Sequence, residues 1–265
     1  MIAAGVDIGS TASKAVILEG DRVAAALIGP SSTNPARTAR EIFQQALAQA
    51  GIAEAQVKCI VGTGYGRAQV AFAHTNISEL SCHGRGAHFF LPSARTVLDL
   101  GGQDTKAICL DRDGNLLDFA MNDKCAAGTG RFLEMMARTL GLELDELAKL
   151  HFQEGEPCVI GNMCSVFAES EVINLVNENT ALPRIVKGLH QSLASRVATL
   201  AKRVGIEPEV VITGGVAKNA GVIDAVARKL GLKLAGFPAG VDPQIIGAVG
   251  AALIAREMAE RAGQG

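Results

Sequence analysis

The chain contains 265 residues, which is enough for one large hydrophobic core or two modest ones. Its formal net charge is -2 and its basic residues are scattered along the chain. The sequence therefore shows no basic patch of the kind that binds nucleic acids or anionic membranes. Six cysteines without regular spacing do not make a secreted disulfide framework. The first stretch of the chain is unlike a secretory signal, because it has no basic region and Asp7 interrupts its apolar run. We therefore expect a cytoplasmic protein.

The first third of the chain predicts three strands and then a helix. An apolar strand over residues 2–8 ends in the loop DIGSTASK, a second strand KAVILEG follows, and a turn leads into a third, VAAALIG. Asn34 then supplies an N-cap and Pro35 a first-turn proline for a helix that runs to about Gly51. The strand VKCIVG, the loop TGYGR and a helix over residues 78–90 complete this part.

The beginning of the chain recurs from residue 97 onward. Residues 6–10 (VDIGS) align without gaps on residues 98–102 (LDLGG), and the SK pair at residues 13–14 aligns on the TK pair at residues 105–106. The strand after each loop matches as well, and each is followed by a hairpin turn. The sequence therefore predicts an α/β protein built from two related lobes.

Each lobe offers a strand, an aspartate, a glycine-rich turn, a hydroxyl group and a lysine. The exposed backbone N–H groups of such a turn can bind phosphate, and an aspartate at a strand end can hold Mg²⁺ directly or through water. One such loop is weak evidence, since glycine and aspartate are common in hairpin turns. Two matching loops on facing lobes favour a nucleotide held from both sides, and neither loop has the G-x-x-x-x-G-K-[ST] pattern of a P-loop.

Two cysteines stand where a loop is predicted to become a helix. Cys125 lies in NDKCAAGTGRFLE, ahead of an apolar helical pattern, and Cys164 lies in GNMCSVFAESEV. A helix start offers unpaired backbone N–H groups and a positive dipole end, which favour a thiolate and an anionic ligand held by it. The two cysteines would make half of a cluster site.

The remaining cysteines have other expected roles. Cys59 and Cys109 lie inside apolar strands and are expected in the core. Cys82 has a neighbouring histidine but no second ligand at helical spacing, which favours a packed helix position. Cys158, six residues before Cys164, is the best rival ligand, although its flanks look like an approaching strand.

The second half of the chain is predicted to be mostly helical. Apolar periodicity predicts helices at residues 132–140, 144–150, 182–204, 219–230 and about 244–262. The strand EVVITGG ends in Gly214 and Gly215, a junction where a ribose or a phosphate can lie against the backbone, although a glycine pair can also simply serve packing. A further strand is predicted near KLAGF.

The two loops and the TGGVAKN segment resemble the superfamily of acetate kinase, sugar kinases, Hsp70 and actin. Within it, NDKCAAGTGRFLE and CSVFAESEV resemble the ATPase activators of 2-hydroxyacyl-CoA dehydratases, of the BadF/BadG/BcrA/BcrD type, and the related ATPase subunits of benzoyl-CoA reductase. The resemblance runs from DIGSTASK through TGYGR, ELSCHG, DLGGQD and TGGVAKN to GAVGAAL. It implies two lobes of the actin-like ATPase fold, residues 1–95 plus 246–265 and residues 96–245, with a nucleotide cleft between them.

The resemblance also implies the roles of individual residues. Asp7 and Asp99 would serve Mg²⁺, and Gln103 would orient the attacking water. ATP or ADP would contact Ser10, Thr11, Ala12, Ser13, Lys14, Gly101, Gly102, Gln103, Asp104, Gly214, Gly215, Lys218 and Gln244. The spacing identifies no strong carboxylate base, and Glu169 or Glu171 can act as one or can be coupling or surface residues.

The function implied is ATP-driven electron transfer by a homodimer. One [4Fe-4S] cluster would lie at the subunit interface, with Cys125 and Cys164 of each chain as ligands. A cubane normally takes four thiolates, so a two-fold axis supplies the half that one chain lacks. The electron would come from reduced ferredoxin or flavodoxin and pass to a 2-hydroxyacyl-CoA dehydratase, a benzoyl-CoA reductase or a double-cubane reductase. Two other classes stay open: a small-molecule kinase of this fold, and a non-catalytic ATP-binding switch like the chaperones.

Overall fold

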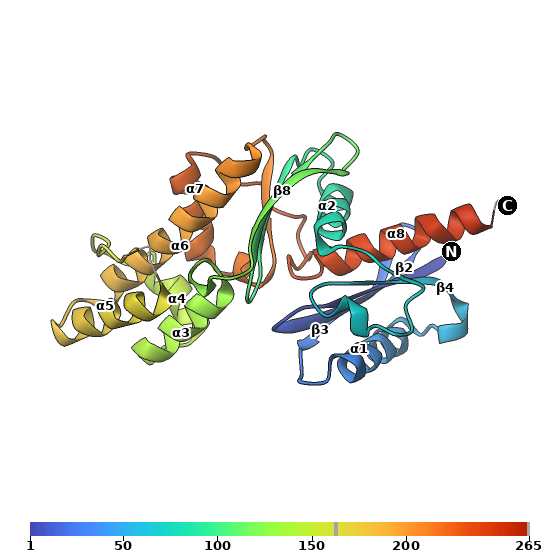
Figure 1. Cartoon of the computed structure of the whole chain (residues 1–265), viewed down its shortest axis with the longest axis horizontal. Helices are drawn as coiled ribbons and strands as arrows, with labels where there is room; N and C mark the ends of the chain where they lie inside the picture. Colours follow the sequence, from blue (N-terminus) through green and yellow to red (C-terminus); the bar gives the residue numbers. More distant parts are fainter. Residues whose placement is uncertain (162–163, 264–265) are drawn as a thin grey trace.

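The computed structural model describes residues 1–161 and 164–263 and contains two mixed β-sheets with helices packed on both (Figure 1). The strand order is β3-β2-β1-β4-β5 in the first sheet and β8-β7-β6-β9 in the second. Helix α2 (Glu79–Phe90) lies between the sheets, and α8 (Ile246–Ala262) packs along the first sheet. The predicted two-lobed α/β architecture is confirmed.

The first lobe is the first sheet with α1. Its elements are β1 (Ile2–Ile8), β2 (Ala12–Glu19), β3 (Arg22–Pro30), α1 (Pro35–Ala50), η1 (Glu54–Gln56), β4 (Val57–Thr63), η2 (Arg67–Gln69) and β5 (Thr75–Asn76). The predicted ends of α1 are confirmed. Asn34 Oδ1 accepts a hydrogen bond from the Arg37 backbone N at 3.1 Å, and Gly51 ends the helix with a φ of 67°, a conformation that glycine adopts without strain.

The second lobe is the second sheet with a layer of helices. Its elements are β6 (Thr96–Leu100), β7 (Thr105–Leu110), β8 (Leu116–Asn122), η3 (Ala126–Gly128), α3 (Gly130–Leu140), α4 (Leu144–Leu150), α5 (Ser165–Asn177), α6 (Leu182–Val204), β9 (Val210–Thr213), η4 (Gly215–Lys218) and α7 (Ala220–Leu230). Helix α6 buries Leu189, Leu193 and Val197 in the core of this lobe. Full burial stabilises the fold by about 1.5–3 kcal/mol for each such side chain.

The internal repeat is visible in the strand register of both sheets. The antiparallel hairpin partners are Asp7 and Lys14 in the first sheet and Asp99 and Lys106 in the second. Both loops close with the same turn, since Gly9 N donates to Ala12 O at 3.2 Å and Gly101 N donates to Asp104 O at 3.0 Å. The gapless alignment of the two halves therefore reflects two copies of one strand-loop-strand unit.

Helices α2 and α8 approach each other closely through glycine. A Cβ added to Gly250 would lie 1.7 Å from Cys82 O, and one added to Gly86 would lie 2.1 Å from Ile246 O. No side chain fits into either space, so the two backbones are in direct contact. Because α2 also packs on β6 and β7, this contact connects the two lobes.

Several sequence-based expectations differ from the structure. Residues 232–237 form no strand and contribute only an isolated bridge between Val211 and Ala235. The α-helix after Cys125 begins at Gly130, because one 3₁₀ turn comes first, and the last helix begins at Ile246. The flanks of Cys158 belong to no strand. None of the helices in the described residues is long and apolar enough to cross a membrane.

Candidate functional site

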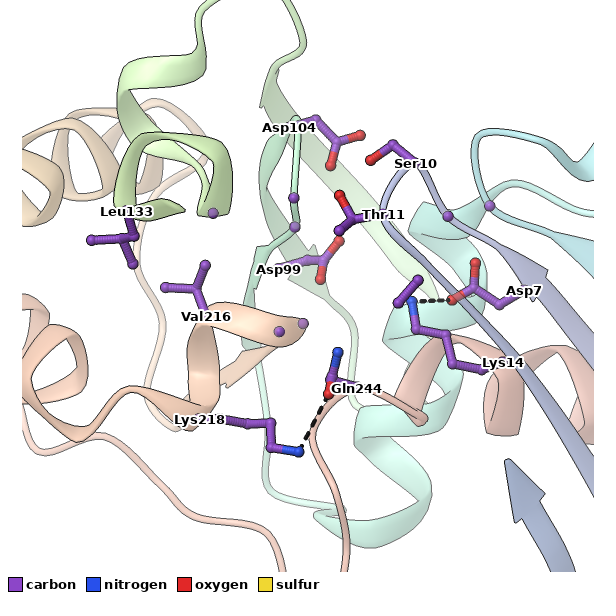
Figure 2. A pocket seen from close by; sticks show the side chains of 18 of the residues that line it. Asp7, Ser10, Thr11, Lys14, Asp99, Asp104, Leu133, Val216, Lys218 and Gln244 are labelled. Carbon is purple, nitrogen blue, oxygen red and sulfur yellow. Dashed lines mark hydrogen bonds and ion pairs between the residues drawn. The ribbon is translucent and has the colours of Figure 1, made fainter. Parts of the chain in front are cut away.

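A cavity of about 550 Å³ lies between the two lobes (Figure 2). Asp7, Ser10, Thr11 and Lys14 enter it from the first lobe, and the second lobe faces them with its own loop and with the η4 turn. Thirteen predicted residues line the cavity: Asp7, Ser10, Thr11, Ala12, Lys14, Asp99, Gly101, Gly102, Asp104, Gly214, Gly215, Lys218 and Gln244. This volume is in the range of pockets that hold nucleotide-sized ligands.

Two predicted residues lie outside the cavity lining. Ser13 is fully buried, and its Oγ lies 2.8 Å from Ser31 Oγ, which in turn donates to Gly9 O at 2.6 Å. Ser13 therefore stabilises the conformation of the first loop without lining the cavity. Gln103 is exposed at the tip of the second loop and does not line the cavity, so its expected role in orienting water stays a prediction.

The two loops touch across the cavity. A Cβ added to Gly102 would lie 2.1 Å from Thr11 Oγ1, so only glycine permits this approach. Thr11 Oγ1 is itself buried and has no hydrogen-bond partner within residues 1–161 and 164–263. A buried hydroxyl group without a partner is costly, and a phosphate oxygen in the cavity would supply one.

Each loop carries an aspartate paired with a lysine. Lys14 Nζ lies 3.2 Å from Asp7 Oδ2, and Lys106 Nζ lies 3.3 Å from Asp99 Oδ2 and 2.8 Å from Asp104 Oδ1. Burial by itself raises the pKa of Asp99, but the charges of His83 and Lys106 outweigh it and lower that pKa to about 2. Asp99 is therefore a carboxylate at neutral pH. Carboxylate oxygens are the ligands that Mg²⁺ prefers, but both oxygens of Asp99 contact Lys106 and Thr213 here, so its expected role in holding that ion stays a prediction.

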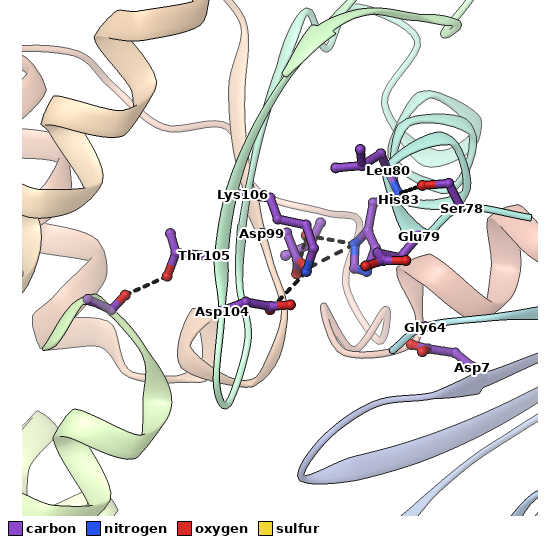
Figure 3. A network of polar contacts seen from close by, with 12 residues as sticks. Asp7, Gly64, Ser78, Glu79, Leu80, His83, Asp99, Asp104, Thr105 and Lys106 are labelled. Carbon is purple, nitrogen blue, oxygen red and sulfur yellow. Dashed lines mark hydrogen bonds and ion pairs between the residues drawn. The ribbon is translucent and has the colours of Figure 1, made fainter. Parts of the chain in front are cut away.

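Sequence reasoning missed the part of the site that comes from α2 (Figure 3). Glu79 and His83 stand one turn apart and both line the cavity. His83 Nδ1 lies 2.9 Å from Thr213 Oγ1, which donates to Asp99 Oδ1 at 3.1 Å. Glu79 accepts from Arg67 Nη1 at 2.7 Å. The i, i+4 spacing of two polar residues in ELSCHG was the available signal, but it does not show which way the helix faces.

Gly214, Lys218 and Gln244, for which a contact with adenosine or ribose is expected, all line the cavity. Gly214, with a φ of 88°, brings the backbone so near β6 that a Cβ would lie 2.4 Å from Leu100 O. Lys218 Nζ lies 2.8 Å from Asp242 Oδ2 and 3.4 Å from Gln244 Oε1. The apolar side chains that line the cavity include Leu133, Leu144, Ala148 and Val216.

The second loop is joined directly to the start of α3. Gly130 N donates to Gly101 O and Arg131 N donates to Gly102 O, both at 2.8 Å. Thr105 Oγ1 also donates to Gly128 O at 2.5 Å (Figure 3). A displacement of the loop therefore moves the 3₁₀ turn and the α3 start together.

The six cysteines are all free thiols, three of them buried and three, including the half-buried Cys158, more accessible. Cys59, Cys82 and Cys109 are buried, which confirms their expected packing role. Burial raises the pKa of Cys82 to about 12, so this side chain stays a thiol. Cys125, at the N-cap of η3, is half-buried, and Cys164, at the N-cap of α5, is exposed.

Helix α6 guides the segment that leads to Cys164. A Cβ added to Gly188 would lie 2.3 Å from Cys158 O, so the backbone of this segment is in direct contact with the helix backbone. One turn later, Ser192 Oγ donates to Gly161 O at 3.4 Å. Residues 158–161 therefore run along α6 toward its C-terminal half.

The next turn of α6 reaches the other candidate cysteine. Arg196 Nη1 donates to Cys125 Sγ at 3.8 Å. Gly161 and Cys164 are three residues apart, so their Cα atoms are at most about 11 Å apart. Successive contacts along α6 are separated by about 6 Å of rise. Cys125 and the segment that ends at Gly161, three residues before Cys164, therefore contact neighbouring turns of α6, and the binding of one cluster by both cysteines stays a prediction.

The residues present fit half of an iron-sulfur site. Within residues 1–161 and 164–263, no three His, Cys, Asp or Glu side chains converge as a metal site. The two thiols at helix starts, Cys125 and Cys164, are half of the usual ligand set of a cubane. Cys164 is followed on α5 by the exposed apolar side chains of Val166 and Phe167, and exposed apolar side chains of this kind are common at interfaces with another chain.

Comparison with known proteins identifies the family of the chain. The BadF/BadG/BcrA/BcrD ATPase family model matches residues 4–255. The chain is 48% identical to the activator of lactoyl-CoA dehydratase of Anaerotignum propionicum, over 98% of this chain and 100% of that protein. It is 44% identical to the (R)-2-hydroxyglutaryl-CoA dehydratase activating ATPase of Acidaminococcus fermentans, over 97% of this chain and 98% of that one.

A solved structure gives the same result for the fold. The activator of the 2-hydroxyisocaproyl-CoA dehydratase from Clostridium difficile with bound ADPNP superposes with a TM-score of 0.92 at 44% identity, covering 100% of this chain and 97% of that chain. The two lobes and the cleft between them are those of the actin-like ATPase fold. The chain therefore belongs to the BadF/BadG/BcrA/BcrD ATPase family.

Proposed function

We propose that this protein is an ATP-dependent one-electron donor that activates a 2-hydroxyacyl-CoA dehydratase. The proposal rests on one observation: a short path of covalent bonds and hydrogen bonds joins the cavity to Cys125. Gly101 and Gly102, in the second loop, accept hydrogen bonds from the start of α3, and Cys125 lies five residues before Gly130. Nucleotide bound in the cavity thus acts on the same segment that would hold the cluster.

The two loops would bind ATP and take part in its hydrolysis. Their glycine-rich turns line the cavity, and Lys14 and Lys106, which also line it, supply positive charge for phosphate oxygens. Asp7 and Asp99 would hold Mg²⁺, which neutralises phosphate charge when bound. The family and the activating ATPase among its relatives support hydrolysis of ATP rather than transfer of its phosphate to a small molecule.

A second copy of the chain would complete the cluster site. One chain offers Cys125 and Cys164, and a two-fold axis near them gives four thiolates. The exposed apolar side chains of α5, among them Val166 and Phe167, would be buried by that partner copy. A bound [4Fe-4S] cluster supplies one-electron chemistry, and the protein holds it through these four sulfur atoms.

The coupling of ATP to the electron has a definite energetic scale. For one electron, 59 mV corresponds to about 1.4 kcal/mol, so lowering a potential by a few hundred millivolts needs several kcal/mol of differential binding. We expect reduced ferredoxin or flavodoxin as the source. The acceptor is a 2-hydroxyacyl-CoA dehydratase, and the alternative is the reductase component of a benzoyl-CoA or double-cubane system.

Anaerobic purification tests the proposal. The parent should be brown and contain about four irons per dimer, because four thiolates hold one cubane. Cys125→Ser and Cys164→Ser should each abolish iron binding, since each change removes two of the four ligands. Cys109→Ala, a buried thiol in the same lobe, should keep the cluster and is the matched control.

Two outcomes would contradict parts of this proposal. A colourless parent that phosphorylates small molecules would replace the electron donor by a kinase of the same fold. A full cluster in Cys164→Ser together with none in Cys158→Ser would move the ligand assignment to Cys158, which stands next to α6 in the same segment.

A further inference from the structure

Arg196 is the charged side chain that α6 places against the sulfur of Cys125. Its Nη1 donates to Cys125 Sγ at 3.8 Å, and the residue is half-buried. Contacts at Ser192 and Gly188, one and two turns earlier, hold the segment that leads to Cys164. Arg196 is therefore the third member of a row along one face of α6 that contacts both cysteine-bearing segments.

Both partners of this contact are held in place. The Cβ and Cδ of Arg196 lie 3.5 and 3.7 Å from the point where a Cβ would stand on Gly128, so the arginine stem lies flat on the η3 turn. Asn122 fixes Cys125 from the other side, since its Nδ2 donates to Cys125 O at 2.7 Å and its Oδ1 accepts from Cys125 N at 3.1 Å. The guanidinium is thus held against the sulfur by contacts within the chain.

We propose that Arg196 raises the reduction potential of the cluster and so makes it reducible by the external electron donor. This inference rests on the proposed function. Reduction takes one electron from a one-electron donor such as reduced ferredoxin or flavodoxin and adds one negative charge to the cluster. A fixed positive charge and a hydrogen bond to a ligand sulfur stabilise the more negative state, and both raise the potential.

The size of the change in potential depends on direct contact between the guanidinium and a ligand sulfur. Arg196 of each protomer would contact one of the four ligand sulfurs, so a symmetric dimer applies the charge twice. Arg203 lines the same 340 Å³ cavity as Arg196, two turns further along α6, but no contact joins it to Cys125 within the described residues. It carries the same charge on the same helix and is the matched control.

The test is a dye-mediated redox titration of three anaerobically reconstituted dimers: the parent, Arg196→Met and Arg203→Met. Iron content and the visible spectrum are recorded first. At the parent's midpoint, the reduced-to-oxidised ratio of Arg196→Met should fall at least tenfold, which is 59 mV for one electron. Arg203→Met should titrate with the parent. Arg196→Lys, which keeps the charge without the planar fork, should lie between the parent and Arg196→Met.

Each contrary result has one meaning. A complete cluster with an unchanged potential in Arg196→Met overturns the inference and leaves the proposed function intact. An equal fall of the reduced-to-oxidised ratio in Arg203→Met also overturns the inference, because the effect would then come from long-range charge rather than from contact. If Arg196→Met binds no iron, Arg196→Lys decides, and a potential equal to the parent's overturns the inference. A parent that binds no iron overturns the proposed function together with this inference.

Discussion

His190 should make the stability of this protein depend on pH, and the structure gives the size of the effect. This side chain of α6 is fully buried, and its Nδ1 lies 3.0 Å from His151 Nδ1. His151 Nε2 lies 3.0 Å from Asp224 Oδ2. A carboxylate only accepts, so His151 carries its proton on Nε2 and accepts the Nδ1 proton of His190. His190 Nε2 is then a buried acceptor without a partner in the described part of the chain.

This arrangement keeps His190 neutral. Burial, and secondly the neighbouring His151, lower the pKa of His190 from 6.5 to about 3. Between these values the unfolded chain binds a proton that the folded chain does not, so the free energy of unfolding rises with pH and falls on acidification. From pH 7 to pH 5 the loss from this one group is about 2 kcal/mol, and across the whole window it is about 5 kcal/mol.

Urea unfolding at pH 7 and pH 5 checks this magnitude. The parent is compared with His190→Gln, whose amide can still donate to His151 but does not titrate. His190→Gln should lose about 2 kcal/mol less than the parent between the two pH values. His88→Gln, a replacement of a partly exposed histidine, should keep most of the parent's slope. An identical slope in the parent and His190→Gln would refute the reasoning.

Three further predictions concern the cavity and the helix pair. Lys106→Met leaves the buried Asp99 without its ammonium partner and should cost about 3–5 kcal/mol, read as a lower Tm; an unchanged Tm would contradict the ion-pair account. Gly250→Val would overlap the carbonyl of Cys82 on α2, and should destabilise by at least about 1–3 kcal/mol in the same assay, whereas a neutral result would mean that the helices can separate freely. Thr11→Val should weaken ATP binding by about 0.5–1.5 kcal/mol in calorimetry, because a hydroxyl group without a partner is lost from a residue that lines the cavity, and equal affinity would remove it from the site.

The repeated loops could be predicted because their signal is local. An aspartate at a strand end, a short glycine-rich turn and a lysine on the returning strand fix a hairpin register, and that register alone places Lys14 opposite Asp7 and Lys106 opposite Asp99. The start of α1 was equally local, since Asn34 and its neighbouring proline define a helix end within four residues.

The parts that escaped prediction depend on contacts between distant segments. His83 reaches Thr213 across 130 positions of sequence, and no periodicity in α2 shows that this face meets the cavity. Arg196 lies 71 positions from Cys125 and stands among helical residues with ordinary amphipathic spacing. Around Cys125 itself, two glycines permit either a helix or a tight turn, and packing on the second loop selects a 3₁₀ turn first.

Stopped-flow oxidation of the reduced dimer, mixed with a 2-hydroxyacyl-CoA dehydratase and Mg-ATP, tests the central claim most directly. The comparison is between the parent and Asp7→Asn, which alters the phosphate end of the cavity and leaves Cys125 and Cys164 untouched. Both proteins should hold the cluster and accept an electron. The parent should pass it on only with ATP, and Asp7→Asn should fail to do so. If a variant that no longer hydrolyses ATP transfers the electron as fast as the parent, ATP is not the gate and the proposed mechanism is wrong.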